Sequence, residues 1–156
     1  MLFFSFVPGA FGALLLCLML ASCGGSRSTM EDFNARDVTL PNGKVIRAEL
    51  ATDQETMARG LMFRESLAPD RGMLFIHQKP GRWQYYMYQC KIPLDMIWMD
   101  NSRRIVEISA DTPPCRSTEA SDCPLYGGHA DARYVLELGG GQAKKNGLKI
   151  GDEISF

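Results

Sequence analysis

The distribution of charge along the chain is the feature that most limits how it can fold. All 17 basic and 18 acidic residues lie from Arg27 onward, and residues 1–26 carry no charged side chain. Residues 10–21 read AFGALLLCLMLA. This apolar run has the length of a signal-peptide core and is short for a bilayer span. We therefore expect an apolar leader, residues 1–22, followed by a domain of a different kind.

The apolar run ends in the sequence LASCGGS at residues 20–26. Small residues before a cysteine, with a leucine ahead of them, resemble the lipobox of bacterial lipoproteins. The resemblance implies a signal peptide at residues 1–22, cleavage before Cys23, and acylation of the Cys23 thiol and new amino group. Three acyl chains hold a protein firmly at a membrane, whereas a single chain binds marginally. Residues 23–36 then form a lipidated tether.

The same segment carries the expected location. Gly24 follows the cysteine, where Gram-negative lipoproteins kept at the inner membrane often have Asp. The resemblance therefore implies a bacterial envelope protein that faces the periplasm, at the outer membrane. The alternative is an uncleaved anchor helix at residues 2–22, which Pro8, Gly9 and Gly12 would weaken. The membrane is the expected partner in both cases, and a net charge of -1 gives no reason to expect nucleic acid.

Residues 37–156 predict a single, mainly β domain. Asn42 and Gly43 separate two short apolar runs, as in a β-hairpin. Thr52 and Glu55 have the spacing of a capping box, which opens a short helix that ends at Gly60. A second helix is expected at residues 142–146. Strands are expected at residues 38–40, 45–51, 72–77, 82–88, 94–100, 104–110, 133–138 and 152–156.

Residues 111–128 read as an irregular stretch, and no parallel strand–helix–strand pattern is visible. We therefore expect a small β-sandwich or partly open barrel with two short helices. Within the irregular stretch, Cys115 and Cys123 are expected to form a disulfide, because an exported chain meets an oxidising compartment. The alternative is a metal site with His129, at a spacing unusual for zinc. Cys90 is expected to be a buried free thiol, and no metal or cofactor is predicted.

The domain resembles a bacterial and archaeal family without an assigned activity, the domain of unknown function 192. The segments that carry the resemblance are ARGLMFR (58–64), GMLF (72–75), IPLDM (92–96), ARYVLE (132–137) and GLKIGD (147–152). The resemblance implies a compact β-sandwich with short helices, often behind a signal peptide. It does not supply a reaction. The family commonly has Met-Lys-Asn-Thr where this chain has MYQC at residues 87–90.

Five side chains are candidates for a ligand site: Arg59, Arg64, Trp83, Asp95 and Glu137. Guanidinium groups bind anions bidentately, so the two arginines could line an anion or sugar pocket. Alternatively, they pair structurally with Asp95 or Glu137. Trp83 follows a Pro-Gly pair and is the ring that we expect to be exposed for stacking on a sugar.

Three functional hypotheses follow. The first is a non-enzymatic ligand-binding or accessory domain of an envelope lipoprotein, with a small molecule or glycan as ligand. The second is a hydrolase of envelope glycans that uses Asp95 and Glu137 as acid and base. The third is a structural partner of another envelope protein, which would present an exposed apolar patch. No nucleophile elbow, phosphate loop or dinucleotide fingerprint is present in the sequence.

Overall fold

The computed structural model describes residues 34–156, so the apolar leader, Cys23 and most of the predicted tether lie outside the described residues. Within this part the chain forms eight strands and two short helices, which confirms the predicted fold class. The strands are β1 (Ala35–Thr39), β2 (Val45–Ala51), β3 (Arg71–Gly81), β4 (Gln84–Tyr86), β5 (Leu94–Met99), β6 (Ile105–Thr112), β7 (Leu125–Gly127) and β8 (Ala132–Gly139). The helices are α2 (Gln54–Arg59) and α3 (Gln142–Lys145), with a 3-10 turn at Ala120–Asp122.

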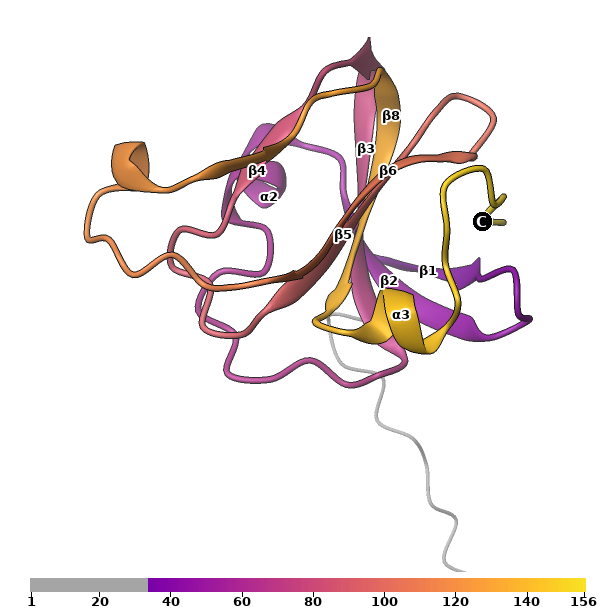
Figure 1. The fold of residues 1–156 in the computed structure, drawn as a ribbon, viewed down its shortest axis with the longest axis horizontal. Helices are drawn as coiled ribbons and strands as arrows, with labels where there is room; N and C mark the ends of the chain where they lie inside the picture. Colours follow the sequence, from indigo (N-terminus) through magenta and orange to yellow (C-terminus); the bar gives the residue numbers. More distant parts are fainter. Residues whose placement is uncertain (1–33) are drawn as a thin grey trace, which may run out of the picture.

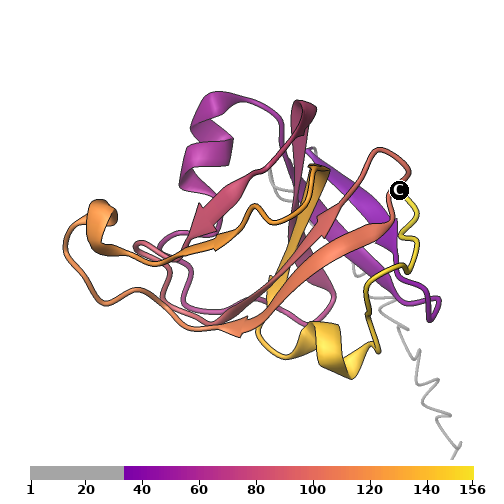
Figure 2. The same ribbon diagram turned by 45° about the horizontal axis from the view of Figure 1, so that its top comes forward.

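Six strands form one mixed sheet in the order β1-β2-β3-β8-β5-β6, and β4 pairs with β7 in a second, two-stranded sheet. β1 and β6 are the two edges of the larger sheet, so the barrel is not closed. Figure 1 shows α2 and β4 on one side of β3 and β8, with α3 and the C-terminus on the other. The turned view in Figure 2 keeps this separation. No helix of the described part is long and apolar enough to cross a membrane.

Several local expectations are wrong. β2 and β3 pair in parallel with α2 in the connection, so a strand–helix–strand unit is present after all. The stretch expected to be irregular contains β7, and the predicted C-terminal strand makes only isolated bridges through Glu153 and Ser155. The N-cap of α2 is Asp53 instead of Thr52, because the Asp53 carboxylate accepts a hydrogen bond of 2.9 Å from the backbone N–H of Thr56.

The larger sheet carries an apolar core on each face. One cluster contains Ile97 and Leu136, and the other contains Trp98 and Val135. Side chains alternate between the two faces along a strand, so sequence neighbours belong to different clusters. All six residues of β5 are buried, as in a strand covered on both faces.

Cys115 and Cys123 form the predicted disulfide, with their Cα atoms 5.7 Å apart. Because both thiols are consumed, the alternative metal site with His129 is not formed. His129 instead contacts the carboxylate of Glu107. Across residues 34–156, no group of three or more metal-ligating side chains comes together. Cys90 is a half-buried free thiol.

Candidate functional site

Asp95 organises the backbone around it. It is fully buried on β5, and its carboxylate accepts hydrogen bonds from the backbone N–H groups of Asp111 (2.6 Å), Gly141 (3.0 Å) and Ala143 (2.5 Å). Several donors can offset the cost of burying a carboxylate. Since Gly141 is the N-cap of α3, Asp95 joins the end of β6 and the start of α3 to β5.

Glu137 lies on the other face of the same sheet. It is on β8 opposite Met96 of β5, the residue after Asp95. Met96 belongs to the cluster with Trp98 and Val135, whereas the flanking residues of β8 belong to the other cluster. Because adjacent side chains of a strand point to opposite faces, the two carboxyl groups do not meet. The structure therefore contradicts the predicted acid–base pair and the glycan hydrolase built on it.

Within the described residues, Arg59 and Arg64 form ion pairs with glutamates other than Glu137, and neither pairs with Asp95. The two terminal nitrogens of Arg64 donate to the two carboxylate oxygens of Glu49, each at 2.6 Å, in a half-buried bidentate pair. Arg59 lies at the exposed end of α2, and its Nη2 is 3.8 Å from Oε1 of Glu55, one helical turn earlier. The structural pairing predicted with Asp95 or Glu137 is therefore wrong.

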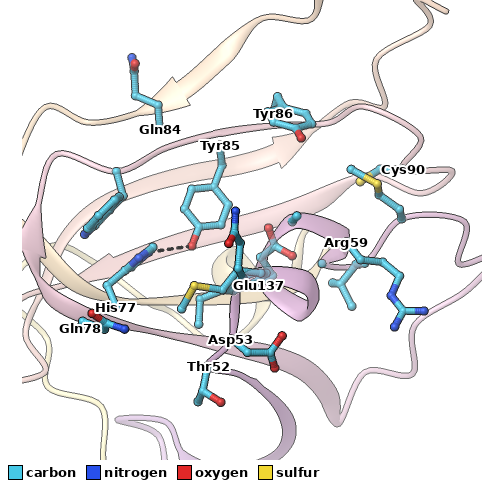
Figure 3. Close-up of a pocket in the computed structure, with 18 of the residues that line it drawn as sticks. Thr52, Asp53, Arg59, His77, Gln78, Gln84, Tyr85, Tyr86, Cys90 and Glu137 are labelled. Atoms are coloured by element: carbon cyan, nitrogen blue, oxygen red, sulfur yellow. Dashed lines mark hydrogen bonds between the residues drawn. The ribbon is translucent and has the colours of Figure 1, made fainter. Parts of the chain in front are cut away.

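A cavity of about 820 Å³ opens between α2, β3, β4 and β8 (Figure 3). We call it the α2 cavity. Its interior is lined by buried and half-buried side chains, with Glu137 at the floor: Met57, Leu61, Met62, Phe75, His77, Trp83, Tyr85, Cys90 and Glu137. The charged lining residues Asp53, Arg59 and Lys79 are exposed at its mouth.

The cavity brings together three of the five predicted site residues: Arg59, Trp83 and Glu137. Arg64 lines a neighbouring groove of about 740 Å³, together with Glu49 and the exposed ring of Phe63. Asp95 lies on the other face of the sheet. The five candidates therefore do not form a single site.

Gly60 allows the chain to leave α2 directly above the cavity floor. Its φ of 47° and ψ of -132° form a backbone conformation that a residue with a Cβ atom rarely adopts. A Cβ atom at this position would lie 3.3 Å from the Phe75 ring and 3.9 Å from Oε2 of Glu137. The glycine of the ARGLMFR segment thus keeps the backbone close to Phe75 and Glu137.

Glu137 is the most unusual group in the cavity. It is 5% exposed, and no donor from residues 34–156 forms a hydrogen bond with its carboxyl group. Burial raises the pKa of this carboxyl to about 8, and the charge of Arg64 only partly opposes the rise. The free protein therefore holds Glu137 mostly protonated at neutral pH. Its oxygens open into the cavity instead of being sealed in the core, so a ligand can supply the partner.

His77, Trp83 and Tyr85 form one wall of the cavity. Nε2 of His77 lies 3.0 Å from Oη of Tyr85, as the dashed line in Figure 3 shows. The imidazole stacks on Trp83, with ring centroids 4.0 Å apart and planes 6° from parallel. Trp83 is therefore half-buried with one face covered, so the prediction of an exposed ring is wrong.

Burial holds the titratable groups of this wall in their neutral forms. It lowers the pKa of His77 to about 4. It also raises the pKa of Tyr85, with a smaller contribution from the charge of Glu137. Cys90 follows the same rule: burial, with Glu137 adding to it, raises the pKa of the thiol to about 12. A thiol of this kind is a poor nucleophile.

His77, Tyr85 and Cys90 were missed as site residues. The sequence did carry one signal for His77. It lies two residues after Phe75 in the same strand, so the two side chains are expected on the same face of the sheet. The contact between Tyr85 and His77 depends on how β4 crosses β3, which no local pattern reports. What the α2 cavity offers is a shaped, mostly apolar space with a few polar groups, as small-molecule sites do.

Two solved structures from bacteria have similar folds. One is a protein of unknown function from Novosphingobium aromaticivorans DSM 12444, 33% identical, with a TM-score of 0.70, covering 78% of this chain and 85% of that chain. Another, from Sinorhizobium meliloti 1021, is described provisionally as a transcription regulator. It is 29% identical, with a TM-score of 0.66, covering 76% of this chain and 89% of that chain. No curated protein matches this chain.

The family model DUF192, described as Uncharacterized ACR, matches residues 38–156. The match spans almost the whole described domain, including Gly60, Asp95 and Glu137. It agrees with the resemblance seen in the ARGLMFR, IPLDM and ARYVLE segments. The chain therefore belongs to the domain of unknown function 192 family.

Proposed function

We propose that this protein is a non-enzymatic ligand-binding domain of the bacterial envelope, and that the α2 cavity binds a small molecule. The observation that carries the proposal is the carboxyl group of Glu137, which lines an open cavity although it is buried and lacks a hydrogen-bond partner within residues 34–156. No donor from the described residues bonds to this group, and its oxygens open into the cavity. A ligand that fills the cavity and donates to Glu137 would offset the cost of burying the carboxyl group.

The envelope location is part of the same proposal. It rests on the LASCGGS segment, from which we infer a lipid on Cys23, attachment to the outer membrane and a domain facing the periplasm. The disulfide between Cys115 and Cys123 supports an oxidising compartment. The proposed partners are thus the membrane, through the lipid, and a small ligand, through the cavity.

A second candidate, a structural partner of another envelope protein, is favoured by one observation. Tyr86 and Leu125 are opposite each other across β4 and β7, and both are exposed. Two side chains cover only part of the several hundred Å² that mark an interaction patch. The cavity with its unsatisfied carboxyl is the stronger indication.

The test is a fragment screen by ligand-observed NMR on the full chain, using small neutral, cationic and anionic molecules. We expect at least one class to bind saturably to the wild-type protein. Met57→Trp places a large ring into the cavity from α2 and should abolish that binding. Val45→Trp adds the same ring at an exposed site outside the cavity lining and should leave binding unchanged. If no fragment distinguishes the wild type from Met57→Trp, the proposal is wrong.

A further inference from the structure

We infer that the ligand of the α2 cavity is an amine with an apolar body, whose ammonium group binds the Glu137 carboxylate on the cavity floor. This inference rests on the proposed ligand-binding function and deepens it. It depends on three features of the cavity: the kind of polar group at the floor, the chemistry of the walls, and the place of the remaining charges.

Once ionised, the polar group at the floor is an acceptor that needs donors. An ionised carboxylate offers two oxygens with about four lone-pair sites and donates nothing. No side chain or backbone N–H from residues 34–156 occupies those sites. Arg64, whose charge acts on Glu137, is held bidentately by Glu49. A ligand rich in N–H groups is therefore the complement of this floor.

The walls are suited to the rest of such a ligand. Met57, Leu61 and Met62 provide aliphatic surface, and Phe75 and Tyr85 provide rings that contact each other edge to face at 5.1 Å. Ring faces attract cations through the quadrupole of the π system. An ammonium group at the floor thus meets one carboxylate and aromatic surface together.

The same walls disfavour the other ligand classes. A glycan carries many hydroxyl groups, and burying hydroxyls against methionine, leucine and phenylalanine without partners is costly. Trp83, the ring expected to stack on a sugar, has one face covered by His77. An anion would meet like charge at Glu137 whenever this carboxyl is ionised, and the cations Arg59 and Lys79 are exposed at the mouth. Glu137 is the one carboxyl group in the mostly apolar interior of the cavity, and it fits a ligand with one cationic head.

The three other cavity groups with a shifted pKa stay neutral near pH 7. His77 on β3 and Tyr85 on β4 are held neutral by burial, and so is Cys90 in the loop after β4. The charged side chains of Asp53, Arg59 and Lys79 lie at the mouth. Binding of an ammonium ion should therefore release about one proton, from Glu137 itself. The free carboxyl has a pKa of about 8. Below this pH, the affinity for the ammonium ion should increase about tenfold for each unit by which the pH is raised.

The experiment is isothermal titration calorimetry of the full chain with matched probes. Benzylammonium and butylammonium ions carry the charged head. Benzyl alcohol and butanol keep the same bodies with a neutral head, and benzoate and butyrate carry an anionic head. We expect the ammonium ions to bind at least about tenfold more tightly than the other probes, the scale of one good charged hydrogen bond. Titrations in two buffers with different heats of ionisation should give about one proton released per ligand.

Glu137→Gln keeps the shape of the floor and removes the charge. It should weaken ammonium binding at least about tenfold, remove the proton release, and leave the alcohols unchanged. Glu55→Gln, on the exposed face of α2 and outside the cavity lining, is the matched control and should leave ammonium binding unchanged.

Three outcomes would overturn the amine inference. Neither ammonium ion binds, the alcohols or carboxylates bind as tightly as the ammonium ions, or Glu137→Gln binds the ammonium ions as the wild type does. In these cases the proposed function stands if the fragment screen still finds binding blocked by Met57→Trp, and otherwise falls with it.

Discussion

Glu137 and Asp95 lie on adjacent strands, and their carboxyl groups leave the sheet in opposite directions. Asp95 accepts three hydrogen bonds from backbone N–H groups. Glu137 accepts none from residues 34–156 and opens onto a cavity. The first carboxyl stabilises the fold, whereas burial of the second opposes folding wherever the carboxyl is ionised. Removing the two charges should therefore have opposite effects on stability.

Asp95→Asn is expected to destabilise the protein. The amide keeps the size of the side chain but has one acceptor oxygen in place of two, so at least one backbone N–H at β6 or α3 loses its partner. The free energy of unfolding should fall by about 1–3 kcal/mol, measured by urea denaturation. Asp131→Asn is the control, because Asp131 is exposed and its ion pair with Arg82 is long, at 4.0 Å. It should change stability by less than about 0.5 kcal/mol. Equal effects of the two substitutions would contradict the structural role of Asp95.

Glu137→Gln is expected to stabilise the protein at alkaline pH. The carboxyl has a pKa of about 8 in the folded protein against an ordinary value of 4.5. Between these values the unfolded chain has released a proton that the folded chain keeps. The stability of the wild type should therefore fall as pH rises from about 4.5 to about 8, by up to about 1.4 kcal/mol per pH unit. Glu137→Gln lacks this contribution. Parallel stability curves for the two proteins would show that burial does not shift the pKa of Glu137.

His77 should make the protein less stable as pH falls, whereas Glu137 makes it less stable as pH rises. Its pKa is about 4 in the folded protein against an ordinary value of 6.5. Between these values the unfolded chain binds a proton that the folded chain does not, so stability is lost as pH falls through this range. His77→Gln should remove the loss, and the difference in unfolding free energy between wild type and variant should shrink from about pH 6.5 to about pH 4. A difference that stays constant with pH would contradict the neutral, buried imidazole.

Arg64→Gln should raise the pKa of Glu137 above its value of about 8. The charge of Arg64 is the one contribution that lowers this pKa against the effect of burial. The shift can be followed by NMR through the side-chain carboxyl carbon of Glu137 during a pH titration. Arg59→Gln removes a charge at the exposed end of α2 and should leave the titration unchanged. A larger shift from Arg59→Gln than from Arg64→Gln would show that the electrostatic influence on Glu137 comes from the mouth of the cavity.

Local sequence signals predicted local structure well in this chain. The Asn42-Gly43 turn between β1 and β2 and the short helix that ends at Gly60 were predicted from sequence neighbours. The disulfide between Cys115 and Cys123 was predicted from the expected export of the chain. The parallel pairing of β2 with β3 was missed, because the order of strands in a sheet depends on the three-dimensional path of the chain. β7 was missed because three residues are too short for an alternating pattern to show.

The site was harder to predict because β5 is buried on both faces. A strand with one wet face shows alternation from which the direction of each side chain follows. Leu94 through Met99 are all buried, so the sequence does not tell on which face Asp95 lies. That face follows from the register between β5 and β8. Glu137 was identified as a candidate from its own strand, but His77 and Tyr85, which line the same cavity, come from strands far away in the sequence.

The lipid anchor that we propose at Cys23 predicts that Cys23→Ser yields a protein without acyl chains. We expect mass spectrometry of the wild-type protein from bacterial membranes to show an N-terminal peptide that starts at residue 23 and carries acyl chains. Cys23→Ser should carry no acyl mass, because serine lacks the thiol that is modified. Cys17→Ser is the matched control, since Cys17 lies inside the apolar run, and it should be cleaved and acylated as the wild type is. A wild-type chain that retains residues 1–22 and an unmodified Cys23 would instead support the uncleaved anchor helix.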